Sequence, residues 1–304
     1  MIVFKPEFHE YISLEGDTQW TSVTSIISKL KEPFDAEATA ERSSKNKKSK
    51  WYGLDKEEIL KQWNYTNKVA TDLGNWYHNQ RETDVCELHN IEREGYTIPI
   101  VRPIIKEGLK YSPPQKVSDG MYPEHLVYMQ SAGLCGQSDL VEIVNGFVNI
   151  TDYKSNKEIR LRGYQSWDGT YKKMLSPVNH LEDCHINHYA LQLSIYMYMI
   201  LRHNPKLKPG KMCIHHVMFR TCGKDKYDNP IYEKDNNGDP IVMDVEVYDL
   251  PYLKEEKKGI GTFWLKQSND KLKYTLYRQE YTCMYIFGDK EELKPLLGNL
   301  PLYS

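Results

Sequence analysis

Apolar residues along the chain recur at helical spacing in some segments and alternate or cluster in others, which predicts a mixture of helices and strands. Residues 186–203, INHYALQLSIYMYMILRH, are apolar on nearly every side, so we expect a buried helix. Residues 55–92 carry apolar positions near helical spacing without a proline, and we expect a long helix there. Other expected elements are a hairpin at HEYISL (9–14) before the turn signal EGD, a helix over 20–30, a polar and mobile connection over 40–50, strands over 211–220 and 239–250 with a turn-rich insert between them, and a charged helix over 251–277.

The segment 133–154, GLCGQSDLVEIVNGFVNITDYK, reads as two apolar strands around Asn145-Gly146. An Asn-Gly pair strongly favours a two-residue hairpin turn, because both turn positions need positive φ. Such a turn fixes the register, and the facing residues are then Val141 with Ile150 and Ile143 with Val148. A three-residue bulged loop would change this register.

The same register places Asp139 opposite Asp152, with Lys154 two residues further along the same face. Two facing carboxylates repel each other unless one is protonated or a cation lies between them. A hard divalent cation such as Mg²⁺ favours oxygen ligands and would resolve the conflict. The alternative is a solvated strand end with ordinary ion pairs; the aliphatic residues on the same face favour the metal site.

These residues resemble the signature of the PD-(D/E)XK nucleases. GQSD (136–139) and TDYK (151–154) match its acids and lysine, with Gln137-Ser138 where the family name has proline. ATDLGNWYH (70–78) resembles the G-x-x-x-H element of the RecB-like exonuclease branch, and LQLSIY (191–196) resembles its Q-x-x-x-Y element. In isolation, each of these two elements is more simply read as ordinary helix packing.

The resemblance implies an α/β fold with a mixed central sheet flanked by helices and an N-terminal helical region. Residues 1–304 would form a single nuclease domain. Its expected parts are an N-terminal hairpin and helical region carrying the histidine motif (1–115), a catalytic core (116–250) and a C-terminal helical segment (251–304).

The resemblance also implies a set of site residues. Mg²⁺ or Mn²⁺ would be held by His78, Asp139, Asp152 and the backbone carbonyl of Tyr153. Lys154 would orient the attacking water, and Glu124 resembles a further acid of some members, although an exposed glutamate is the simpler interpretation. Residues expected to position the site or meet DNA phosphates are Gln192, Tyr196, Lys157, Arg160 and Arg162.

Composition narrows the picture only slightly. The chain is 40% hydrophobic and 27% charged, with a net charge of −2, so any positive nucleic-acid groove must be local; the run KNKKSK (45–50) is typical of a solvated surface. The six cysteines form no C-x-x-C pair and only Cys283 lies near the C-terminus, which argues against an iron–sulfur cluster or a disulfide framework. Without an apolar run of about 20 residues or a signal-like start, we expect a cytoplasmic protein with no membrane contact.

The expected function is a metal-dependent DNA exonuclease that acts on single-stranded ends. An exonuclease that acts on double-stranded DNA is the next alternative. The helical block over 55–92 could arch over a single strand, as in the mitochondrial relatives of this family. Recombination or replication proteins are the partners that the resemblance suggests. Two alternatives stay open: a structure-specific or restriction-type endonuclease, and a catalytically silent nucleic-acid-binding module.

Overall fold

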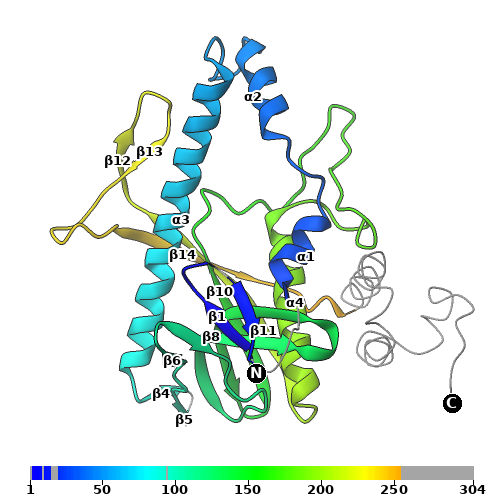
Figure 1. Cartoon of the computed structure of the whole chain (residues 1–304), viewed down its shortest axis with the longest axis vertical. Coiled ribbons are helices and arrows are strands. Elements are labelled where there is room, and N and C mark those ends of the chain that lie inside the picture. Colours follow the sequence, from blue (N-terminus) through cyan, green and yellow to red (C-terminus); the bar gives the residue numbers. More distant parts are fainter. Residues whose placement is uncertain (1, 9, 15–19, 94, 255–304) are drawn as a thin grey trace, which may run out of the picture.

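The computed structural model describes residues 2–8, 10–14, 20–93 and 95–254 (Figure 1). Four α-helices lie in this part of the chain: α1 (Val23–Lys29), α2 (Ala36–Lys45), α3 (Lys56–Glu87) and α4 (His185–His203). The strands are β1 (Ile2–Lys5), β2 (Glu10–Ser13), β3 (Thr21–Ser22), β4 (Asn90–Arg93), β5 (Tyr96–Pro99), β6 (Ile104–Lys106), β7 (Leu109–Tyr111), β8 (Gly120–Met129), β9 (Leu134–Val144), β10 (Phe147–Lys154), β11 (Lys208–Phe219), β12 (Thr221–Lys224), β13 (Pro230–Tyr232) and β14 (Val242–Asp249).

A six-stranded sheet forms the centre of the molecule, in the order β14-β11-β10-β9-β3, with β8 also paired to β9. β10 and β11 run parallel, and α4 belongs to the crossover that parallel strands require. β9 is antiparallel to β8 and β10 and parallel to β3. The expected mixed α/β class is therefore confirmed.

The β9–β10 hairpin has the predicted two-residue turn. Asn145 and Gly146 both have positive φ, 50° and 78°. The pairing runs from Phe147↔Val144 to Thr151↔Leu140, which is the expected register. The four aliphatic residues of the inward face, Val141, Ile143, Val148 and Ile150, are fully buried in the main core.

Helices cover both faces of this sheet. α1 and α4 share the main core with the inward face of the β9–β10 hairpin. α3 packs on the opposite face, where Leu73 and Tyr77 contact Tyr153, Val217 and Phe219. The ends of β9 and β10 nearest Asp139 and Asp152 are therefore enclosed from two sides. Within the described residues no helix is long and apolar enough to cross a membrane.

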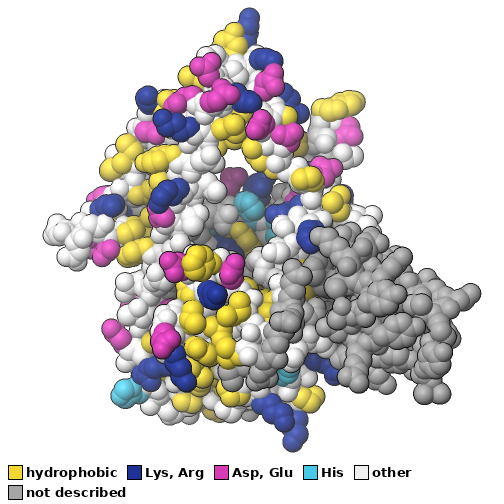
Figure 2. Space-filling view, viewed as in Figure 1, with side chains coloured by type: hydrophobic (Ala, Val, Ile, Leu, Met, Phe, Trp, Pro, Cys, Tyr) yellow, Lys and Arg dark blue, Asp and Glu magenta, His cyan; other side chains and the backbone are white. Residues whose placement is uncertain are grey.

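α2 and the N-terminal half of α3 rise from the sheet body and converge at residues 46–55, forming an arch (Figure 1). Trp51 and Ile59 are buried with Ala40 between the two helices. Figure 2 shows a hollow between this arch and the sheet body, in which basic, acidic and histidine side chains are visible.

Several local expectations were wrong. Residues 40–50 do not form a polar connection throughout, because α2 extends to Lys45 and begins at an Asp35 side chain that accepts a hydrogen bond from the Ala38 amide. The N-terminal hairpin turns before HEYISL, since β2 pairs with β1, and the EGD segment lies outside the described residues. The insert over 221–238 contains a short hairpin, β12–β13. Of the C-terminal segment 251–304, residues 255–304 also lie outside the described residues, together with Cys283.

Candidate metal centre

Three carboxylates lie on three adjacent strands, at the point where β10 separates from β9. Asp139 belongs to β9, and the β8 pairs Pro123↔Leu140 and His125↔Ser138 place Glu124 opposite it. The β10 ladder ends at Thr151↔Leu140, one residue before Asp152 and Asp139 would face each other. Asp139 is instead tied to β10 by the Tyr153 amide, which donates a hydrogen bond of 2.6 Å to its Oδ2.

Glu124 adopts an unusual backbone conformation for this position. Its φ is +50°, a value that non-glycine residues seldom adopt inside a strand and that persists only where the surrounding structure holds it. It follows Pro123 in β8, whose side away from β9 is bridged within the described residues only at Met121, to Ile100, so that proline is tolerated at position 123. The side chain is nearly buried, and Gln137 of β9 donates a hydrogen bond to its Oε2.

His78 of α3 completes this group from the other side. Its Nδ1 lies 3.4 Å from Asp139 Oδ1 and 3.8 Å from Glu124 Oε1. One ligand atom from each of the three residues falls within a 4.8 Å group. An imidazole nitrogen with two carboxylate oxygens is a donor set that suits Mn²⁺, and the oxygens alone suit Mg²⁺. These three residues therefore form the candidate metal centre.

Asp152 and Lys154 form a buried ion pair next to this centre. Lys154 Nζ contacts Asp152 Oδ2, and Gln192 of α4 donates a hydrogen bond of 3.4 Å to Asp152 Oδ1. Asp152 Oδ2 has this ion pair but no hydrogen bond, so it keeps a capacity to accept a further partner. Asp152 as a metal ligand stays a prediction, as does the carbonyl of Tyr153.

The titration behaviour of the acids follows from this arrangement. Burial lowers the pKa of His78, but the charge of Asp139 and hydrogen bonds to Asp139 and Glu124 outweigh it and raise the pKa to about 10. Burial, and then the charge of Asp139, raises the pKa of Asp152 to about 6 against the opposing charge of Lys154. Burial also raises the pKa of Glu124. Asp139 is buried too, but the His78 charge holds its pKa below the usual value. His78 and Lys154 balance much of the carboxylate charge, and a divalent cation bound at His78 Nδ1 would take the place of its proton.

The motif residues of α4 support β9 and β10 and are buried. Gln192 Nε2 lies 3.4 Å from both Asp152 Oδ1 and the Tyr196 hydroxyl. The Tyr196 ring lies directly against Gly136 of β9, where an added Cβ would sit 2.8 Å from the hydroxyl and closer to the ring. Gly136, the first residue of the GQSD motif, is therefore needed for close packing.

We predict that Gly136→Ala lowers the free energy of unfolding by roughly 1–3 kcal/mol, the usual cost of overpacking a core. The Tyr196 ring is 2% exposed and has no room to move away. Urea unfolding monitored by circular dichroism measures the change. Gly223→Ala is the matched control, because nothing lies within 4 Å of a Cβ at that strand glycine. Equal stability of the two variants would contradict the packing argument.

The three basic residues expected to meet phosphate lie on the segment between β10 and α4, outside the metal centre. Arg162 is bound by both oxygens of Glu182 at 2.8 Å and stacks on Tyr171. Arg160 contacts His185 Nε2 at 3.2 Å, and Lys157 is exposed. Arg162 is thus already neutralised, which leaves Lys157 and Arg160 as the better candidates for phosphate contacts.

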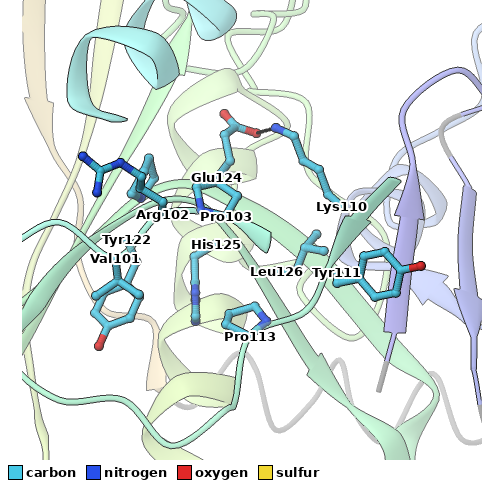
Figure 3. A pocket seen from close by; sticks show the side chains of 11 residues that line it. Val101, Arg102, Pro103, Lys110, Tyr111, Pro113, Tyr122, Glu124, His125 and Leu126 are labelled. Carbon is cyan, nitrogen blue, oxygen red and sulfur yellow. Dashed lines mark ion pairs between the residues drawn. The ribbon is translucent and has the colours of Figure 1, made fainter. Parts of the chain in front are cut away.

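Two charged residues that the sequence reasoning missed extend the centre. Figure 3 shows Glu124 and Lys110 pointing toward each other, while His125 points away from both. Lys110 Nζ lies 3.7 Å from Glu124 Oε2 and 2.7 Å from Glu82 Oε2. The cavity that Figure 3 depicts has a volume of about 10 Å³. Glu82 continues the four-residue spacing of Gly74 and His78 along α3, and this signal could have revealed it.

A larger groove, of about 510 Å³, lies elsewhere on the sheet. Leu140, Glu142 and Thr151 line it, and they alternate with the residues that face the metal centre and the core. Its acid Glu142 is paired with Arg93. The charged centre and this groove are therefore separate.

The fold and the site together define a mixed α/β protein with a buried carboxylate–histidine–lysine centre where β10 separates from β9. No protein-family model matches the chain, and neither the curated proteins nor the solved structures contain a match.

Proposed function

We propose that the chain is a divalent-metal-dependent nuclease of the PD-(D/E)XK kind, in its RecB-like branch, that hydrolyses DNA phosphodiester bonds. The observation that carries the proposal is the meeting of four separate sequence motifs at one place. One ligand atom from each of His78, Glu124 and Asp139 lies within 4.8 Å of the others, and the Asp152–Lys154 pair adjoins them through Tyr153. Buried acids and a histidine with shifted pKa values, grouped around one point, are typical of a functional site.

The donors fit a hard divalent cation. Asp139, Glu124 and His78 would hold Mg²⁺ or Mn²⁺, with Asp152 as a further candidate ligand. When bound, the ion would lower the pKa of a water ligand and neutralise negative charge on the phosphate. Lys110 and Glu82 would keep Glu124 oriented, because surrounding partners fix the geometry of ligating carboxylates.

Lys154 is the residue that would act on the reacting phosphate. Burial disfavours its charge, but Asp152 and Asp139 more than compensate and raise its pKa, so it stays protonated at neutral pH. A fixed ammonium group beside the centre can donate hydrogen bonds to the attacking water and to the negative charge that develops on the phosphate. Asp152 holds the ammonium group in place, and Gln192 holds Asp152.

The arch supports action on single-stranded ends. The hollow between α2, α3 and the sheet body (Figure 2) would admit a single nucleotide strand under α2 and α3, and an end would thread through it more readily than an interior segment. Exonuclease action is therefore the form of the activity that we propose.

Purified protein is expected to degrade linear single-stranded DNA in Mg²⁺ or Mn²⁺ and to spare a circular single strand of the same sequence. EDTA should abolish degradation, and added Mn²⁺ should restore it. Substrates labelled at either end, resolved on a denaturing gel, report both results and the direction of digestion. Cleavage of the circle would favour an endonuclease, and a mobility shift without degradation would favour a binding module. Equal rates in EDTA and Mg²⁺ would reject metal catalysis.

A further inference from the structure

One face of α3 connects the metal centre to the arch. Trp63, Asn67, Ala70, Gly74 and His78 follow one another at spacings of three or four residues and so share this face. His78 comes 15 residues after Trp63, which corresponds to about 22 Å along the helix. The face points toward the site, because a Cβ added at Gly74 would lie 3.0 Å from Ser155 Oγ, just after β10.

An exposed aromatic ring stands at the far end of this face. Phe34 precedes α2, is 71% exposed, and has its ring centroid 6.0 Å from that of Trp63. Trp63 is partly buried and is itself held by Trp51, with ring centroids 6.3 Å apart. Phe34 is therefore supported on one side by a fixed aromatic pair, while most of its own surface faces solvent. A single exposed ring is common on protein surfaces, but this ring is held by two tryptophans at the end of a helix face that leads to His78, so it can offer a flat surface to a ligand.

We propose that Phe34, supported by Trp63, stacks on one base of a single nucleotide strand whose phosphate lies at the metal centre. This inference rests on the proposed nuclease function and deepens it. The occupant follows from the surroundings: small and polar side chains separate the aromatic pair from His78, and the hollow contains lysine or arginine side chains that suit a phosphate backbone (Figure 2). The base at Phe34 lies several nucleotides away from the cleaved bond, and the interaction is independent of its identity because every base has a flat aromatic face.

The span predicts a dependence on substrate length. An oligonucleotide too short to cover about 22 Å reaches the metal centre but not Phe34. Lengthening the substrate one nucleotide at a time should lower KM in a step at the length where a base first reaches Phe34, with little change in kcat.

The deciding experiment compares Phe34→Ala with the full-length wild-type chain. We expect Phe34→Ala to raise KM for a long single strand at least about fivefold, the lower end of the loss on removing one base–aromatic stack. Phe34→Trp should restore the wild-type value, and hydrolysis of a dinucleotide should be unchanged. Tyr65→Ala is the matched control. Tyr65 is 57% exposed and lies on α3 like Trp63, but it points away from the face that carries Trp63 and His78.

A scan with single abasic positions provides a second measurement. A purely structural role of Phe34 would not make binding depend on the position of the abasic sugar. A single abasic sugar at the position opposite Phe34 should weaken binding of the wild-type protein and leave binding to Phe34→Ala unaffected. Fluorescence anisotropy in EDTA measures this without cleavage, so the result does not depend on the nuclease activity. Intact cleavage with no effect of Phe34→Ala or of any abasic position would overturn the stacking inference alone. Absence of cleavage with the Phe34-dependent binding intact would overturn the nuclease and keep the inference, and absence of any binding would overturn both.

Discussion

Replacing Asp139 by asparagine is expected to lower the rate of DNA cleavage in saturating Mg²⁺ by at least about 100-fold, the effect of removing one preorganised charge-stabilising group. Asp139 is the central acid of the site: it lies in register with Glu124 and its Oδ1 is 3.4 Å from His78 Nδ1. Asparagine keeps an oxygen that accepts the hydrogen bond of the Tyr153 amide, so the fold should be retained. Single-turnover cleavage of a labelled single strand measures the rate.

Calorimetric titration with Mn²⁺ tells a lost ligand from a damaged fold. The Asp139→Asn variant should bind Mn²⁺ more weakly than the wild type and unfold at a similar urea concentration. Asp244→Asn serves as the control, because Asp244 is an exposed carboxylate of the same sheet whose side chain only accepts from the Val245 amide. Wild-type Mn²⁺ affinity and cleavage in Asp139→Asn would remove this residue from the metal centre.

The parts of this site that lie close in sequence could be predicted because local rules determine them. The Asn145-Gly146 turn fixes the register of β9 and β10 without help from the rest of the chain, and this register brings Asp139 and Asp152 to one end of the hairpin. Similarly, the four-residue spacing of Gly74 and His78 places both on one face of a helix. Only the meeting of that helix with the hairpin needed the three-dimensional structure.

The third acid was harder to place. The segment YSPPQKVSDGMYPEH contains three prolines, which are typical of irregular backbone, yet β8 begins within it. Proline is tolerated at position 123 because the side of β8 away from β9 is bridged, within the described residues, only at Met121, and whether a strand lies at an edge is a property of the whole sheet. The family resemblance pointed to Glu124. That Glu124 lies opposite Asp139 of β9 became known only from the pairing register of β8 and β9.

Long-range contacts account for the remaining omissions. Lys110 reaches Glu82 and Glu124 from β7, and nothing in the sequence around LKY indicates either partner. α2 was missed because only Ala40 of its residues is buried, so its apolar pattern is weak; its stability comes from the Asp35 cap and from packing on α3.

Replacing Lys154 by alanine is expected to lower the cleavage rate by about 100- to 1,000-fold, because the group that would stabilise charge on the phosphate is lost. The same change should lower the free energy of unfolding by roughly 3–5 kcal/mol, since it leaves a buried carboxylate without its cation. Asp152 is 1% exposed, and its remaining hydrogen bond, from Gln192, is 3.4 Å long. Urea unfolding and single-turnover cleavage measure the two effects separately.

A double variant separates these roles of Lys154. Lys154→Met combined with Asp152→Asn removes both charges and keeps the side-chain volumes similar, so most of the lost stability should return while cleavage stays absent. Lys234→Ala, an exposed lysine between β13 and β14 with no proposed role, should leave the free energy of unfolding and the cleavage rate close to those of the wild type. A catalytic role for Lys154 requires that cleavage stay lost when the stability of the fold is restored. If the stable double variant cleaves DNA at the wild-type rate, the Asp152–Lys154 pair is a structural ion pair, and the resemblance to the nuclease signature at these two positions has no catalytic meaning.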